Sequence, residues 1–163
     1  MSEPGDTRTD SPVIGIDLGT TYSCVAIFNR ETQKAEVLRN KNGKSTMPSV
    51  IAYGETGDKA QIGEAAYGKP NFICDAKRVI GQTYGEFFAD KPLMRSLPYN
   101  VTKGKDDAAV IKPFRGMKKD QILFEAVGAK ILTELKGLAD ERTNEDVRDA
   151  VITVPANFNA NQK

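Results

Sequence analysis

Apolar residues form two short runs near the N-terminus, at 13–18 and 22–28, with a turn of one glycine and two threonines between them. Both runs are rich in β-branched and aromatic residues, so we predict two strands joined as a hairpin. A β-branched run at 149–154 predicts another strand, which Pro155 ends. Runs that are apolar almost throughout are typical of strands covered on both faces. Strands of this kind expose apolar surface and an unpaired edge wherever the elements that cover them are missing.

Weaker runs predict further strands. Residues 99–102 and 108–111 are expected to pair as a hairpin around the polar turn 103–107, and two more strands are expected at 35–39 and 49–53.

The clearest helical pattern lies at 120–139, where apolar residues recur at spacings of four and three. Asp120 is the expected N-cap of this helix. A shorter helix is expected to open at 62–67, and the pattern is weak from 85 to 113. The apolar positions of the long helix are Leu123, Val127, Ile131, Leu135 and Leu138.

The composition is that of an ordinary globular protein, with 39% hydrophobic residues, 28% charged residues and a formal net charge of +1. The length of 163 residues allows one domain. The charges are interspersed, so they do not indicate a nucleic acid or a membrane as a partner. The absence of histidine excludes histidine bases and metal ligands, and the two cysteines, Cys24 and Cys74, are too few for a structural zinc site. Cys24 is expected to be a buried thiol, and a disulfide with Cys74 is left open.

Residues 1–12 are polar and rich in turn-forming residues, so we predict a disordered N-terminal tail. This segment has neither the apolar core of a secretory signal nor the arginine-rich pattern of a transit peptide. No apolar run approaches the roughly 18 residues of a membrane span. These observations favour a cytoplasmic protein.

The turn between the first two strands has the residue types of a phosphate site. Asp17 ends the first strand, and Gly19 allows close approach of a ligand to the backbone. Successive amides from Gly19 to Tyr22 can converge on an anion, and the neighbouring hydroxyls and carboxylate suit hydrated magnesium. The alternative is a plain Gly-Thr turn with Asp17 solvated. A P-loop that ends at 43–45 (Gly-Lys-Ser) is disfavoured, because Leu38 stands where its first glycine belongs and Pro48 falls where its helix has to run.

A longer comparison of residues favours the phosphate site. Residues 13–26 resemble, residue for residue, the opening of the seventy-kilodalton heat-shock chaperones, the DnaK-type family; they read Val-Ile-Gly-Ile-Asp-Leu-Gly-Thr-Thr-Tyr-Ser-Cys-Val-Ala. Three further segments match in the same order, namely 48–49 (Pro-Ser), 75–81 (Asp-Ala-Lys-Arg-Val-Ile-Gly) and 150–156 (Ala-Val-Ile-Thr-Val-Pro-Ala). The chain is identified as a member of that family over residues 13–163.

The resemblance implies an α/β fold of the actin-like ATPase (ribonuclease H-like) class, of which this chain holds the first lobe only. Residues 13–163 are then an incomplete nucleotide-binding domain with a mixed sheet, helices and a small subdomain. The base of the lobe is expected at 13–53 and 149–163, and the small subdomain at about 54–148.

The resemblance also implies the roles of single residues. Asp17 contacts the metal through water, and Lys77 is both a phosphate ligand and the catalytic residue, since its ammonium stabilises charge on the transferred phosphoryl group. Pro155 is the allosteric switch that relays the nucleotide state. The phosphates are held by Gly19, Thr20, Thr21 and Tyr22.

The sequence departs from the family pattern at several points. The segment before Asp75 is several residues shorter than usual, Asn157 replaces an aromatic residue, and Lys163 replaces an arginine. The second phosphate hairpin, the adenosine pocket and the peptide-binding domain lie beyond Lys163 in the family. We expect the isolated chain to be inactive as an ATPase.

By resemblance, the chain is the N-terminal fragment of an ATP-dependent molecular chaperone that assists protein folding, refolding and the stress response. Its expected cofactors are ATP or ADP and Mg²⁺, with K⁺ as a further candidate ion. Its expected partners are unfolded client proteins, J-domain co-chaperones and nucleotide exchange factors. The alternative is a truncated, non-hydrolytic interaction module that binds co-chaperones or other proteins. A sugar kinase of the same superfamily is disfavoured by the match at 75–81.

Overall fold

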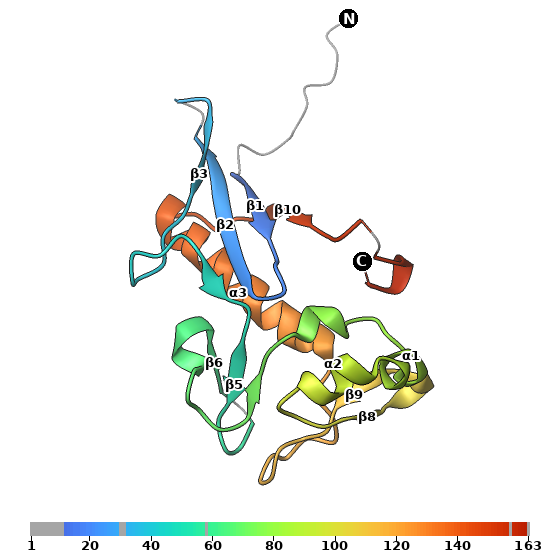
Figure 1. Cartoon of the computed structure of the whole chain (residues 1–163). Coiled ribbons are helices and arrows are strands. Elements are labelled where there is room, and N and C mark those ends of the chain that lie inside the picture. Colours follow the sequence, from blue (N-terminus) through green and yellow to red (C-terminus); the bar gives the residue numbers. More distant parts are fainter. Residues whose placement is uncertain (1–11, 30–31, 58, 157, 163) are drawn as a thin grey trace, which may run out of the picture.

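The computed structural model describes residues 12–29, 32–57, 59–156 and 158–162, so most of the predicted tail lies outside the described residues. Its largest sheet has the order β10-β1-β2-β3 (Figure 1). Strand β1 pairs antiparallel with β2 and parallel with β10, and the short β4 pairs with the beginning of β2. The predicted N-terminal hairpin is therefore confirmed. The strands of this sheet are β1 (Val13–Asp17), β2 (Tyr22–Asn29), β3 (Lys34–Val37), β4 (Met47–Pro48) and β10 (Asp149–Thr153).

Helix α3 (Phe124–Thr143) packs against β1 and β2 and covers one face of the sheet. The residues of β1 alternate between buried and exposed, because every second side chain points to this helix. The opposite face stays open, and Phe28 and Val151 are 54% and 66% exposed there. The expected exposure of apolar sheet surface is confirmed.

The predicted bounds of the long helix, 120–139, are wrong at both ends. The helix begins four residues later than predicted, and Leu123, not Asp120, is its N-cap. Leu123 is 42% exposed, whereas the other predicted apolar positions are buried or partly buried. Asn144 ends the helix in the left-handed conformation, with a φ of 56°, which a short polar side chain tolerates.

A second, antiparallel sheet has the order β6-β5-β7 and consists of β5 (Ile51–Tyr53), β6 (Ala60–Ile62) and β7 (Phe72–Ile73). The strand predicted at 49–53 is wrong at its start, because β5 begins at Ile51. The helix expected at 62–67 is a single 3₁₀ turn, η1 (Gly63–Ala66). Between β7 and α3 the predicted hairpin is present as β8 (Val101–Lys103) and β9 (Ala109–Ile111).

Two helices of six residues each, α1 (Tyr84–Ala89) and α2 (Lys91–Ser96), occupy the region where the sequence pattern was weak. Each is too short to show a helical period. Side-chain caps define them instead. Thr83 and Glu86 form a reciprocal capping box at α1, and the Asp90 carboxylate accepts a hydrogen bond from the Leu93 amide at α2, 3.0 Å long.

One large hydrophobic core joins these elements, from Ile14 in β1 through Ile51 and Ile73 to Phe87 and Phe124. Strand β5 was assigned to the base but pairs with β6 and β7, and α3 was assigned to the small subdomain but packs on β1 and β2. The division of the lobe into two parts stays a prediction.

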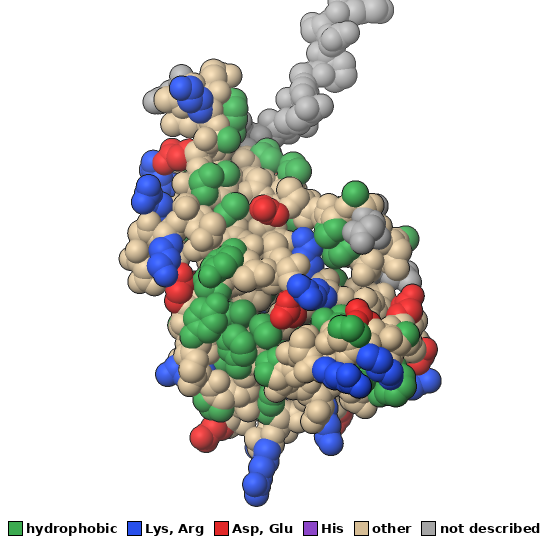
Figure 2. All heavy atoms as spheres, viewed as in Figure 1, with side chains coloured by type: hydrophobic (Ala, Val, Ile, Leu, Met, Phe, Trp, Pro, Cys, Tyr) green, Lys and Arg blue, Asp and Glu red, His purple; other side chains and the backbone are tan. Residues whose placement is uncertain are grey.

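The surface of the protein is mixed in character. Acidic and basic side chains are interspersed, and hydrophobic side chains gather in the middle of one face (Figure 2). Cys24 and Cys74 are both free and only partly buried, so Cys24 is less enclosed than predicted. Among the described residues there is no helix that is long and apolar enough to cross a membrane.

Candidate functional site

The turn between β1 and β2 is unusually tight at Gly19. A Cβ atom at this position would lie 2.0 Å from the carbonyl oxygen of Tyr22, a distance that no side chain can tolerate. Glycine is therefore required by the close approach of backbone to backbone.

Hydrogen bonds hold this turn from the inside. The Gly19 N–H donates to Oγ of Ser23, 3.2 Å away, and the Ser49 N–H donates to the carbonyl oxygen of Thr21 at 2.9 Å. The hydroxyls of Ser23 and Ser49 are bonded to each other at 2.8 Å. The sequence predicted that the Gly19 amide faces an anion, whereas this amide is used within the protein. The N–H groups of Thr20 and Thr21 have no hydrogen-bond partner among the described residues.

Lys77 reaches the same turn from a distant part of the chain. It lies in the 3₁₀ helix η2 (Ala76–Arg78), which Ala76 and Val79 fix in the core with exposures of 5% and 0%. The Lys77 ammonium donates a hydrogen bond to the carbonyl oxygen of Leu18 and lies 5.7 Å from the ring centre of Phe158. The shorter segment before Asp75 thus leaves this lysine at the hairpin.

The segment before η2 is anchored by a buried tyrosine. The Tyr99 hydroxyl donates to the carbonyl oxygen of Cys74, 2.6 Å away. Burial, followed by the charge of Asp75, raises the pKa of the Cys74 thiol to about 11. Cys74 is therefore a neutral packing residue at neutral pH.

Asp17 lies at the other side of the turn, at the end of β1. Its carboxylate accepts a hydrogen bond from the Thr153 hydroxyl, 2.7 Å away, because these two residues are partners in the β1–β10 register. Asp17 is exposed, so one carboxylate oxygen is tied to β10 while the group as a whole remains open to water.

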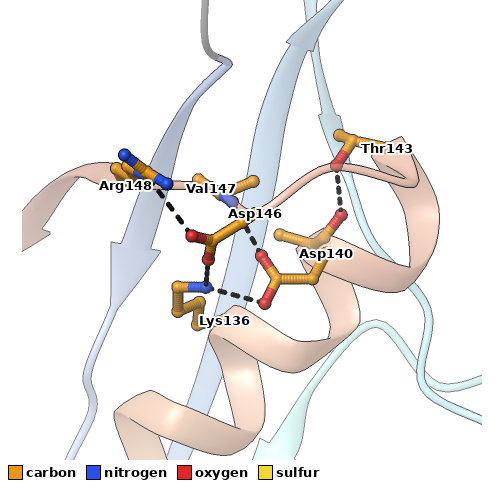
Figure 3. Close-up of polar contacts among 7 residues, drawn as sticks. Lys136, Asp140, Thr143, Asp146, Val147 and Arg148 are labelled. Carbon is orange, nitrogen blue, oxygen red and sulfur yellow. Dashed lines mark hydrogen bonds and ion pairs between the residues drawn. The ribbon is translucent and has the colours of Figure 1, made fainter.

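The connection from α3 to β10 is held by a cluster of charges (Figure 3). The Lys136 ammonium lies 2.7 Å from Asp140 and 2.8 Å from Asp146, and Asp140 also accepts a hydrogen bond from the Val147 N–H at 2.9 Å. The bond from Lys136 is the main cause that holds the pKa of each of these two carboxyls below its ordinary value. The cluster ties the last turns of α3 to the residues just before β10.

A cavity of about 320 Å³ opens beside the hairpin. Polar lining at the hairpin comes from Gly19, Thr20, Ser49 and Lys77, and much of the remaining wall consists of residues of α3 and β10, most of them apolar. A second, more open cleft of about 580 Å³ shares Thr20 and Lys77 and is also lined by Arg78 and Pro155.

The structure thus brings most of the predicted site residues to one place. Gly19, Thr20 and Lys77 share a cavity, and Pro155 lines the adjoining cleft. Neither the cavity nor the cleft is lined by Asp17, Thr21 or Tyr22. Thr21 and Tyr22 continue the turn, and the Tyr22 side chain is 54% exposed. Among the described residues there is no cluster of three His, Cys, Asp or Glu side chains that could hold a metal ion.

Four residues of the site had not been singled out from the sequence, namely Ser23, Ser49, Thr153 and Phe158. Ser23 could have been found as a single hydroxyl within an apolar strand. Ser49 and Thr153 lie in the segments 48–49 and 150–156 that resemble the family, but their place beside the hairpin is set by the fold. Phe158 is brought to the hairpin by the fold alone.

Comparison with known proteins identifies the family. The family model described as "Hsp70 protein" matches residues 13–163. The chain is 37% identical over 159 residues to a "Heat shock 70 kDa protein" of Trichophyton rubrum. This match covers 94% of the chain and 23% of that protein. It is 36% identical over 160 residues to a "Heat shock 70 kDa protein 2" of Paracoccidioides lutzii, again 94% of this chain and 23% of that protein.

The chain belongs to the Hsp70 family, as the resemblance predicted, and it spans about a quarter of the length of these relatives. Its mixed sheet with few helices fits a partial lobe of the actin-like ATPase fold, so the predicted fold class is confirmed.

Proposed function

We propose that this chain is the N-terminal, phosphate-binding part of an ATP-dependent chaperone that acts in the cytoplasm. The observation that carries the proposal is the meeting of Lys77 with the Gly19 turn. The Lys77 side chain lines one cavity with Gly19 and Thr20 of the turn, although these residues are far apart in the sequence. The N–H groups of Thr20 and Thr21 have no hydrogen-bond partner among the described residues.

The residues of the turn fit a nucleotide phosphate. Its free N–H groups are donors for phosphate oxygens, and Gly19 lets the ligand approach the backbone closely. The Lys77 ammonium adds a positive charge at the same end of the cavity, where it stabilises charge on the terminal phosphate. The phosphates would carry Mg²⁺, with the exposed Asp17 carboxylate accepting hydrogen bonds from the water around the metal.

The partners of the whole protein belong to the proposal as well. We assign ATP and ADP as nucleotides, K⁺ as a further candidate ion, and unfolded clients, J-domain co-chaperones and nucleotide exchange factors as protein partners. Pro155 lines the same cleft as Thr20 and Lys77, which supports a role in relaying the state of the nucleotide.

The proposal is tested by titrating ¹⁵N-labelled residues 1–163 with Mg·ATP and following the amide resonances of Thr20 and Thr21. We expect both to shift with a dissociation constant in about the millimolar range, which is about 4 kcal/mol of binding, because the donors described here act on the phosphates alone. Adenosine, which lacks phosphates, is the matched ligand and should leave both resonances in place. Equal shifts with adenosine, or none with Mg·ATP, would contradict the proposal.

The role of Lys77 is tested in a longer protein that contains this chain. Lys77→Ala should lower the single-turnover rate of ATP hydrolysis strongly and leave nucleotide binding largely intact, since the charge acts mainly in the transition state. Lys91→Ala is the matched control, because the Lys91 ammonium also lies over a ring, 3.3 Å from the centre of Phe88, but not at the hairpin. If Lys77→Ala hydrolyses ATP at the same single-turnover rate as the parent, Lys77 is not a catalytic residue.

A further inference from the structure

Two buried hydroxyls lie beneath the phosphate turn. Ser23 and Ser49 are 1% and 4% exposed and are the two buried polar side chains of the described part of the chain. The other buried side chains there are apolar, apart from the hydroxyls of Tyr53 and Tyr99. A buried polar group is costly unless it is hydrogen-bonded, so a pair of serines at this place needs a reason.

The hydrogen bonds of the pair all lead to the turn. Ser23 accepts from the Gly19 N–H, the two hydroxyls bond to each other, and the Ser49 N–H reaches the Thr21 carbonyl oxygen. The hydroxyl pair thus holds the turn at its first residue, and the Ser49 main chain holds it at its third. In the described part of the chain the Thr20 and Thr21 N–H groups have no hydrogen-bond partner.

Ser49 comes from a different element than the turn. It lies in the connection between β4 and β5, so it links the hairpin to the start of the second sheet. The packing of strand β2 does not require a serine, since an alanine at position 23 would suit an apolar strand interior at least as well. The hydroxyl pair therefore serves the turn and not the strand.

We propose that Ser23 and Ser49 are positioning residues of the phosphate site. Their hydroxyls hold the Gly19 turn in the shape that presents the Thr20 and Thr21 amides, and they set the affinity for a phosphate-bearing ligand through the backbone of the turn. Ser23 does not line the cavity, whereas Ser49 lies at its wall. This inference rests on the proposed function and adds to it two residues that act through the backbone of the turn.

The test separates positioning from stability by comparing a single and a double variant of residues 1–163. Ser23→Ala removes the acceptor of the Gly19 N–H and leaves the Ser49 hydroxyl buried without its partner. We expect a roughly three- to tenfold weaker affinity for Mg·ATP, faster exchange of the Gly19 amide hydrogen and a lower urea midpoint. The double variant Ser23→Ala/Ser49→Ala removes both hydroxyls, so its urea midpoint should return toward the parent value. Its affinity should stay weak, because the Gly19 N–H still has no acceptor.

Thr143→Ala is the matched control. The Thr143 hydroxyl is likewise bonded to the backbone, because it donates to the carbonyl oxygen of Ala139 at 2.9 Å, but it lies at the far end of α3. This variant should leave the affinity for Mg·ATP unchanged.

Three outcomes would overturn the inference. If the affinity for Mg·ATP and the urea midpoint both recover in the double variant, the two hydroxyls contribute only to the stability of the fold. If the parent binds Mg·ATP and Ser23→Ala binds it with the same affinity, the inference is rejected and the proposed function stands. No binding by the parent would reject the proposed function itself and, with it, the site that the pair is said to position.

Discussion

Strands β1 and β10 are paired residue for residue, yet their surroundings differ. Every second residue of β1 is buried, whereas all five residues of β10 are exposed. Both segments are apolar, and both were predicted as strands of the same kind. The difference arises because β1 lies between two neighbours and under α3, while β10 has β1 as its single neighbour in the described sheet. An apolar run therefore indicates a strand but does not fix how much of it is buried.

The sharpest comparison is between two isoleucines that are direct partners across these strands. Ile16 is 3% exposed and Ile152 is 40% exposed. Ile16→Ala should lower the free energy of unfolding by about 2–5 kcal/mol, because it leaves a cavity in the core. Ile152→Ala should cost about 1 kcal/mol or less. Urea unfolding of residues 1–163 measures both values, and equal losses would show that β10 is buried in solution.

A smaller effect is expected at the two edges of the sheet. The edge at β3 carries Lys34 and Glu36, whereas the edge at β10 offers Val151, which is 66% exposed. Charged edges resist pairing with another chain, so we expect residues 1–163 to self-associate through β10. Val151→Lys should make the chain monomeric at concentrations at which the parent self-associates, as measured by light scattering.

Val37→Lys is the matched variant on β3, where Val37 is 48% exposed. It should leave self-association unchanged. A parent chain that is monomeric at all concentrations would contradict the role of the β10 edge.

The smallest effect concerns the charge cluster that precedes β10. The pKa values of Asp140 and Asp146 are lowered from 3.8, mainly by the hydrogen bonds from Lys136. A carboxyl with a depressed folded pKa stabilises the fold above its ordinary pKa, and this contribution is lost as the pH falls below 3.8 through the depressed values. Asp140→Asn should therefore lower the urea midpoint slightly at about pH 7, and the difference from the parent should shrink toward about pH 3.

Asp120→Asn makes the same substitution at an exposed carboxyl outside the cluster and is the matched control. A difference between Asp140→Asn and the parent that stays constant with pH would mean that the charges of the cluster do not stabilise the β10 connection.

Much of the site could be predicted from the sequence because its motifs are local. The hairpin is coded by two β-branched runs and a Gly-Thr-Thr turn, and the lysine is recognised by its neighbours Asp75 and Arg78. Helices α1 and α2 were missed because six residues do not give a period, and their capping residues became readable only with the structure. The start of α3 was placed too early because Asp120 is a good N-cap by residue type, whereas the packing of Phe124 decides where the helix begins.

The sequence by itself determined the family, the strands of the hairpin and the identity of the residues at the turn, since these depend on neighbours along the chain. The tertiary structure alone decided that the Lys77 ammonium meets the Leu18 carbonyl oxygen, that Thr153 bonds to Asp17, and that Ser49 lies under the turn. The reason is physical: these contacts join segments 26 to 136 residues apart, and their geometry is set by strand register and core packing, which no local pattern encodes.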